Sequence, residues 1–253
     1  MNTKYFIDTF GPKPDHVLAA VKIAIQIAHK DKEITGIVLY SYTKNNFMQV
    51  CEVFGEQNVQ KMFKEPIRIS NISVPFLCKT EKTYCPSSED KHILIGCHLD
   101  AKALYKLDDI PSAKYIIAIP WIPENTKPWI KRWNAIEFDV DGKIKKRQTT
   151  ITEGNSILRT ALICMDNAML NTKCLSHKSD EEECKTYVRA IFKYIPDASK
   201  EEIENILVTE LQWKSINAQE VGFLLEKLKQ GKRFNGGSTR NLKQIYENWK
   251  KRN

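Results

Sequence analysis

The chain has 253 residues, of which 42% are hydrophobic and 28% are charged, so its composition is that of a folded globular protein and excludes a disordered one. Its longest apolar runs, at 17–28 and 115–122, fall short of the roughly 20 residues that a membrane-spanning helix needs. The seven cysteines are odd in number and scattered, and the first residues lack the pattern of a signal peptide. We therefore expect a cytoplasmic protein with reduced thiols and no membrane partner.

The net charge of +8 is distributed unevenly along the chain. Residues 226–253 carry nine basic and two acidic side chains, whereas residues 149–225 carry eight basic and twelve acidic ones. The last segment therefore holds almost as much net positive charge as the whole chain. This asymmetry favours an anionic partner, such as nucleic acid, at the carboxyl-terminal end.

In residues 1–149, short apolar segments alternate with helical patterns. Strands are predicted at 5–7, 36–40, 92–96 and 114–119, with weaker candidates at 67–69 and 74–78. Helices are predicted at 15–28 with Asp15 as N-cap, at 47–63, at 100–107 and within 120–133. A hairpin is expected over 135–147, because Asp141-Gly142 suits a tight turn. Strands that alternate with helices predict a Rossmann-like α/β domain with a mainly parallel sheet.

Residues 150–253 show only helical patterns and are predicted to form a smaller all-α domain. Its helices are expected near 152–170, 180–195, 199–211, 218–229 and 239–251. Four of them have a capping residue three positions before a glutamate, namely Thr150, Asp180, Ser199 and Asn217. Ser238 is the predicted N-cap of the last helix.

Ligands of open parallel sheets bind beyond the carboxyl ends of the strands. Small, hydroxyl-bearing, basic and aromatic residues follow these ends, and we predict that they hold an anionic or nucleotide-like ligand: Thr9, Gly11, Ser41, Thr43, Lys44, Asn45 and Trp121. Neither the glycine-rich dinucleotide fingerprint nor the P-loop pattern is present, so the ligand and any cofactor stay unassigned.

An alternative prediction is catalysis at the same edge. Cys97, His98 and Asp100 follow one strand and offer a nucleophile, a base and an orienting carboxylate. Asp100 is equally well explained as a helix N-cap. No metal site is predicted, because the Cys and His residues at 78–98 and at 174–184 lack the paired spacing of structural zinc sites.

The basic end of the chain is predicted to contact nucleic acid. Two amphipathic helices flank a loop in which Gly236 and Gly237 would let the backbone approach a phosphate, and Phe234 would stack on a base. The predicted contact residues are Lys232, Arg233, Phe234, Gly236, Gly237, Ser238, Arg240 and Lys243. The alternative for this segment is an ordinary solvated helix face with a basic terminus.

Three functions are compatible with these patterns. The first is a binding or regulatory protein whose α/β domain holds a nucleotide-like or anionic ligand and whose helical domain contacts nucleic acid. The second is an enzyme that acts on a nucleotide, nucleoside or nucleic acid at the strand ends. The third is a protein-interaction module that forms oligomers through its helical domain. We favour the first.

Overall fold

The computed structural model describes residues 3–69, 72–145, 155–170 and 173–253. The chain divides into two compact units, Met1–Gln148 and Thr149–Asn253, and each is described by itself. Among the described helices, none combines the length and the apolar character that crossing a membrane requires.

The first unit is built on a six-stranded sheet in which every pair of neighbouring strands is parallel, with the order β3-β2-β4-β5-β1-β6. The strands are β1 (Lys4–Ile7), β2 (Gly36–Ser41), β3 (Phe76–Thr80), β4 (His92–Cys97), β5 (Ala113–Ile119) and β6 (Ile136–Phe138). All residues of β2 and β4 are buried, as expected for continuous apolar strands that helices cover on both faces.

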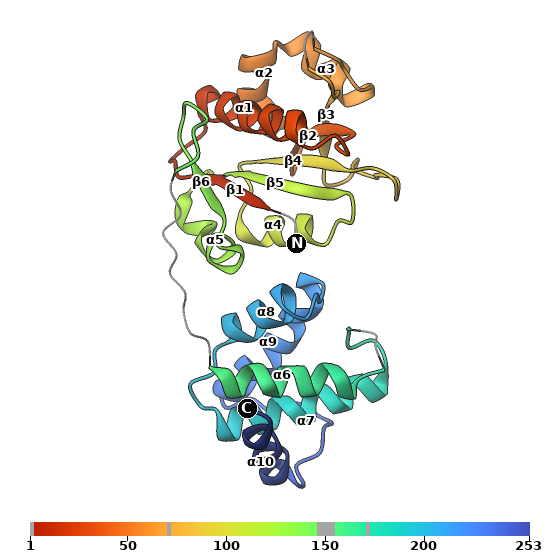
Figure 1. Cartoon of the computed structure of the whole chain (residues 1–253), viewed down its shortest axis with the longest axis vertical. Coiled ribbons are helices and arrows are strands. Elements are labelled where there is room, and N and C mark those ends of the chain that lie inside the picture. The colour runs from red at the N-terminus through yellow and green to blue at the C-terminus, as the bar shows by residue number, and fades with distance from the viewer. Residues whose placement is uncertain (1–2, 70–71, 146–154, 171–172) are drawn as a thin grey trace. The chain divides into compact units, whose positions relative to one another are not determined.

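Helices cover the two faces of this sheet (Figure 1). One face carries α1 (Pro14–Lys30), α2 (Met48–Phe54) and α3 (Glu56–Lys64), and the other carries α4 (Ala101–Asp108) and α5 (Lys127–Trp133). Alternate residues of a strand point to opposite faces, so Ile93 and Ile95 join the first core layer while Leu94 joins the second. The predicted α/β fold class with a Rossmann-like parallel sheet is confirmed.

Several local predictions in this unit differ from the structure in detail. Helix α1 begins at Pro14 with Lys13 as N-cap, so Asp15 lies inside its first turn; proline suits that position because it lacks an N–H group. The helix expected at 47–63 is divided at Gly55, whose φ is +82°. The weak strand at 67–69 is reduced to a single antiparallel bridge between Ile67 and Phe76.

The expected hairpin over 135–147 forms only in part. Its first arm is β6, which pairs in parallel with β1 and so becomes the edge of the main sheet. Its second arm is limited to an isolated bridge between Phe138 and Ile144, around a turn in which Gly142 has a φ of +78°. The end of the predicted hairpin, at Arg147, lies outside the described residues.

A buried ion pair ties the start of the sheet to its second helical layer. Lys4 Nζ on β1 lies 2.9 Å from Asp108 Oδ1 at the end of α4, and both side chains are almost fully buried. The indole N–H groups of Trp129 and Trp133 on α5 donate to the other oxygen of Asp108 at 2.9 and 2.6 Å. These hydrogen bonds offset the cost of burying the two charges.

The described elements of the second unit are helices: α6 (Ser156–Ala168), α7 (Lys178–Tyr194), α8 (Lys200–Thr209), α9 (Ser215–Lys229) and α10 (Leu242–Arg252). Helix α7 packs against α6, α9 and α10, and α8 packs against α9. Two aromatic pairs join α10 to α7, because Tyr246 stacks on Tyr194 at 4.9 Å and Trp249 stacks on Tyr187 at 5.8 Å. The predicted helical region after the α/β domain is therefore confirmed.

Of the caps predicted for the described helices of the second unit, that of Ser199 is confirmed, as a reciprocal capping box with Glu202. Asp180 lies inside α7 and instead accepts from the backbone N–H of Leu170 at 2.9 Å. Asn217 lies inside α9 and donates to the carbonyl of Lys173 at 2.7 Å. Ser238 precedes α10 by several residues, and Asn241 is the N-cap there. The pairing of Thr150 with Glu153 lies outside the described residues.

Candidate ligand and nucleic-acid sites

The strand order separates two groups of residues that the sequence placed at one ligand edge. Strands β2 and β1 are three strand spacings apart, or about 14 Å. Thr9 and Gly11 follow β1, whereas Thr43, Lys44 and Asn45 follow β2. A single phosphate cannot reach both groups, so the predicted ligand site divides into two candidate positions.

The position beyond β1, β4 and β5 brings hydroxyl, imidazole and indole groups together. Thr9 Oγ1 lies 2.6 Å from Nε2 of His16, at the start of α1. The ring of His98, directly after β4, contacts the edge of Trp121 with 5.5 Å between ring centroids. The N–H of Gly11 donates to the carbonyl of Trp121 at 2.9 Å and so holds the β1 and β5 loops together. Thr9, Gly11, His98 and Trp121 of the predicted set therefore meet here.

His98 is the unusual member of this cluster. Its side chain is buried, and neither ring nitrogen has a hydrogen-bond partner among the described residues. Burial lowers the pKa of His98 to about 4, and the nearby His16 acts in the same direction, so the imidazole is neutral at pH 7. Its backbone has a φ of +58°, a conformation that residues other than glycine adopt rarely, although histidine adopts it more often than most.

The outer surface of this cluster is aromatic. Phe10 is 71% exposed and Trp121 is 48% exposed, and both lie in loops that follow neighbouring strands β1 and β5. A planar ligand could stack on such side chains.

Cys97 and Asp100 do not join His98 in this cluster. Cys97 is fully buried in the core between the sheet and α1, and burial raises the pKa of its thiol to about 12. Asp100 caps α4 through the N–H of Ala103 and also accepts the hydroxyl proton of Tyr42 at 2.8 Å. The structure thus gives each of the three predicted catalytic residues different surroundings.

The residues that follow β2 form the second position. Ser41 is buried and donates to the carbonyl of Cys97 at 3.0 Å, so its hydroxyl has a structural partner. Thr43, Lys44 and Asn45 are exposed in a short 3-10 turn, η1 (Lys44–Phe47). The hydroxyl of Thr43 donates to Asn46, and the ammonium of Lys44 lies 5.1 Å from the ring centre of Phe63. The first contact lies within the turn, and the second joins the turn to α3.

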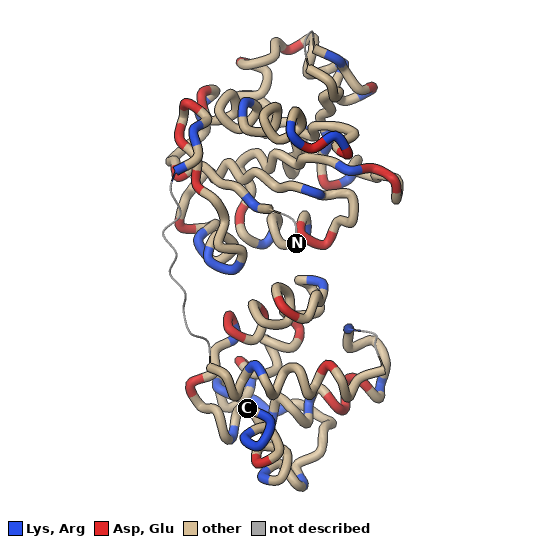
Figure 2. The backbone as a smooth tube through the Cα atoms, in the orientation of Figure 1, with Lys and Arg blue, Asp and Glu red and all other residues tan. Residues whose placement is uncertain are grey.

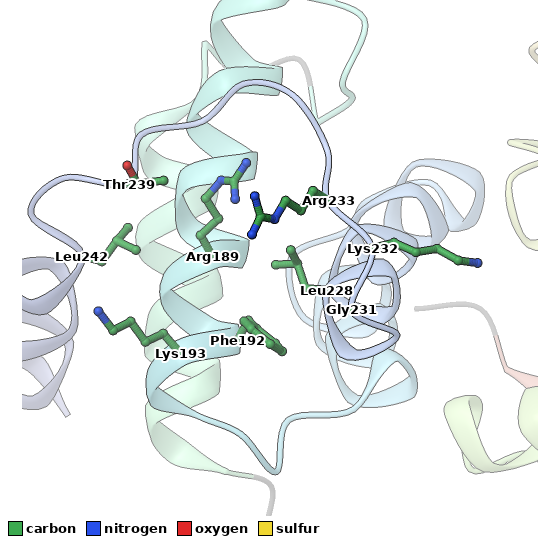
Figure 3. Close-up of a pocket in the computed structure, with 9 residues that line it drawn as sticks. All are labelled: Arg189, Phe192, Lys193, Leu228, Gly231, Lys232, Arg233, Thr239 and Leu242. Carbon is green, nitrogen blue, oxygen red and sulfur yellow. The ribbon is translucent and has the colours of Figure 1, made fainter.

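The second unit contains a pocket of about 380 Å³ with a basic rim, which we call the basic pocket. It lies between α7, the end of α9 and the loop that leads to α10, and its lining residues are Arg189, Phe192, Lys193, Leu228, Gly231, Lys232, Arg233, Thr239 and Leu242 (Figure 3). The predicted contact residues Lys232 and Arg233 are among them.

The rim carries four cations and no carboxylate. Figure 3 shows that the guanidinium groups of Arg189 and Arg233 point toward one another, whereas Lys232 points away from the pocket. None of the four has an ion-pair partner among the residues that the structure describes. Further basic residues gather at the end of α10, where Lys250, Lys251 and Arg252 lie close to the carboxyl terminus (Figure 2).

The glycine-rich loop approaches a helix rather than leaving its backbone free for a phosphate. The N–H of Gly237 donates to Glu182 at 2.7 Å, and the N–H of Ser238 donates to Thr186 Oγ1 at 2.7 Å. Arg189 donates from α7 to the carbonyls of Phe234 and Gly236 at 2.8 and 2.9 Å. The N–H groups of Gly237 and Ser238 therefore already have partners on α7.

The other predicted contact residues differ in their surroundings. Phe234 is half-buried, and the guanidinium of Arg189 lies over its ring at 4.4 Å from the centre. Arg240 and Lys243 are exposed near the start of α10. Their contact with nucleic acid remains a prediction.

Sequence reasoning missed the part of the site that lies on α7. Arg189, Phe192 and Lys193 follow the i, i+3, i+4 spacing of one helix face, which places an exposed aromatic ring between two cations. That spacing could have been noticed. The sequence could not show that this helix face lies close to the loop at 231–241, because the two segments are about 40 residues apart in the chain.

Residues 154–250 match a family model described as a domain of unknown function (DUF1889). All residues that line the basic pocket fall within this range. No curated protein matches the chain, and no solved structure matches it.

We predict that His98 makes the stability of the α/β unit depend on pH. Its pKa is about 4 when folded and about 6.5 when unfolded, so the unfolded state takes up a proton first as the pH falls. The free energy of unfolding should be constant above about pH 6.5 and should decrease between pH 6.5 and pH 4. Urea unfolding of the whole chain across this range measures the effect.

The matched variants are His98→Asn, in which asparagine tolerates a positive φ, and His29→Asn at an exposed position. The first should flatten the pH dependence and the second should leave it unchanged. Burial also lowers the pKa of His16 and His92, so a residual slope is expected. An identical slope in wild type and His98→Asn would contradict the assignment.

We also predict that Gly237→Ala loosens the loop from α7. A Cβ atom at Gly237 would lie 2.7 Å from Cβ of Lys185 and 2.9 Å from backbone atoms of α7, which cannot move aside. Gly231→Ala is the control, because its φ is also +72° but nothing lies within 4 Å. Both variants carry the backbone cost of about 1–2 kcal/mol, and Gly237→Ala should be clearly less stable than the control in thermal unfolding of the second unit. If the two variants lose the same stability, the close approach of Gly237 to α7 adds nothing to the cost of the substitution.

Proposed function

We propose that this chain is a binding protein whose helical unit contacts nucleic acid through the basic pocket and whose α/β unit holds a nucleotide-like ligand at the His98 cluster. The observation that carries the first part is the set of four cations around one pocket with no carboxylate among the lining residues. Like charges on a protein surface repel one another, and yet two guanidinium groups here point toward each other.

Electrostatics supports an anionic partner with closely spaced charges. A phosphate between the two guanidinium groups would replace their repulsion with charge-assisted hydrogen bonds. Nucleic acid supplies a phosphate at every nucleotide, and its binding releases condensed counterions. Arg240 and Lys243, together with the basic end of α10, would extend the interaction along the backbone of the nucleic acid.

The second part of the proposal rests on the chemistry of the His98 cluster. Trp121 and Phe10 offer exposed rings, and the imidazole of His98, whose two nitrogens have no partner among the described residues, packs against Trp121. A nucleobase has both a stacking face and a polar edge, so it is a suitable ligand for this arrangement. Of the residues after β2, Ser41 donates to the carbonyl of Cys97 and Thr43 donates to Asn46, so their hydroxyl groups already have partners outside this cluster.

We predict that nucleic-acid binding depends steeply on salt. The variant Lys232→Gln/Arg233→Gln/Arg240→Gln should bind more weakly, and its plot of log affinity against log salt should be flatter by about 0.7–0.9 for each phosphate that the variant no longer neutralises. Fluorescence anisotropy with a labelled oligonucleotide measures both quantities.

The control removes the same charge from exposed residues of the α/β unit, in Lys61→Gln/Lys64→Gln/Arg68→Gln. It should retain the affinity and the slope of the wild type. Binding that is insensitive to salt, or an equal loss of affinity in the two triple variants, would count against a specific role for the basic pocket.

We predict that adenosine monophosphate, used as the probe, raises the unfolding temperature of the α/β unit. A ligand at 100 times its dissociation constant stabilises the folded state by about 2.7 kcal/mol. Trp121→Ala should abolish this shift, and Ile122→Ala, the exposed apolar neighbour, should keep it. A shift that survives Trp121→Ala would move the ligand away from this cluster, and no shift with the wild type would exclude this nucleotide as its ligand.

A further inference from the structure

The basic pocket has an apolar floor below its cationic rim. Phe192, Leu228 and Leu242 supply the floor, and Figure 3 shows Phe192 beside Leu228 below the two guanidinium groups. The volume of about 380 Å³ falls at the lower end of the range for small-molecule sites, about 300–1,000 Å³. A simple phosphate site needs no such floor, so the pocket suits a ligand that combines an apolar body with negative charge.

The rim is partly fixed before any ligand arrives. Arg189 donates to two loop carbonyls and lies over the ring of Phe234, so its guanidinium is held in place. A fixed guanidinium loses little conformational freedom on binding. Thr239 also lines the pocket, but Figure 3 shows its hydroxyl on the side away from the other lining residues.

From these features we infer that the basic pocket receives one unstacked base of a single-stranded nucleic acid, while the neighbouring phosphates contact Arg189 and Arg233. The inference rests on the proposed function and makes it more specific. The base would cover the ring of Phe192 and the leucine side chains.

A single strand suits the pocket better than a duplex. In a duplex the bases are paired and stacked inside, so only its phosphates could reach the rim, and extruding a base costs a few kcal/mol. In a single strand the bases are already accessible, and stacking of a base on an aromatic side chain contributes to binding. The concave, ring-lined pocket therefore favours the single strand, whereas the exposed cations of α10 would accept either form.

An acidic peptide with apolar side chains is the main competing occupant. The rim favours nucleic acid, because two arginines point into the same space and guanidinium planes both pair with phosphates and stack on bases. The acidic segment at 180–183 of this same chain is a poor candidate for such an occupant, because Glu182 already accepts a hydrogen bond from the N–H of Gly237.

The test compares a labelled oligothymidylate of about 12 nucleotides, a length within the range of single-strand sites, with the matching duplex at the same salt. With the full chain, the single strand should bind at least about tenfold more tightly than the duplex. Phe192→Ala should weaken single-strand binding at least about fivefold and leave duplex binding and the salt slope unchanged. Phe223→Ala removes an exposed ring of the same unit that does not line the pocket, and it should change neither affinity.

Thermal unfolding of each variant checks that it folds. A second measurement uses the wild-type chain, so its result does not depend on how well a variant folds. A strand with one bromouracil, irradiated with the wild-type chain, should crosslink to a peptide that contains Phe192 or residues 228–233. A crosslink confined to other peptides would overturn the inference.

The outcomes separate the two proposals. Equal affinity for strand and duplex, with no effect of Phe192→Ala, would overturn base insertion and leave the proposed nucleic-acid contact intact. Binding of neither form would overturn both proposals. Binding of an acidic Glu/Leu peptide that depends on Phe192, with no binding of the strand, would assign the pocket to a protein partner and would also overturn both.

Discussion

The contact between the glycine-rich loop and α7 determines where the basic end of the chain lies. Gly237 approaches the backbone of α7 so closely that a side chain would collide with it, and the N–H groups of Gly237 and Ser238 donate to side chains of that helix. Arg189 closes the contact from the other direction by donating to two loop carbonyls. Because the loop is held in this way, Lys232 and Arg233 share one pocket with Arg189 and Lys193.

The glycines therefore serve a different purpose from the one their sequence context suggested. A loop with two adjacent glycines before a helix is typical of a phosphate cradle, in which backbone N–H groups bind the anion. Here the same freedom of the backbone is used to dock the loop on a neighbouring helix, and basic side chains of the loop line a pocket instead. The basic residues that cluster near the end of the sequence thus lie, in the folded chain, around the apolar residues of the basic pocket.

The α/β unit shows how strand order selects among candidate residues. Its six parallel strands bring all carboxyl ends to one edge, but the order places β2 and β1 far enough apart that their loops serve different positions. Neighbouring strands β4, β5 and β1 instead bring His98, Trp121 and Thr9 together. The resulting cluster is uncharged and aromatic at neutral pH, because burial keeps His98 neutral. The two units thus offer different chemistry, one aromatic and neutral, the other cationic.

The sequence by itself determined the elements whose cause is local. Apolar runs such as residues 93–95 predict buried strands, the spacing of Leu242 and Trp249 predicts an amphipathic helix, and the pair of Ser199 and Glu202 predicts its own capping box. Only the tertiary structure decided which polar groups are free. Asp180 and Asn217 bond to groups outside their helices, Cys97 is buried, and Arg189 contacts a loop distant in the chain, with which Phe192 shares a pocket. The physical reason is that periodicity and capping depend on a few adjacent residues, whereas the satisfaction of a hydrogen bond or a charge depends on whatever the fold brings within about 3 Å.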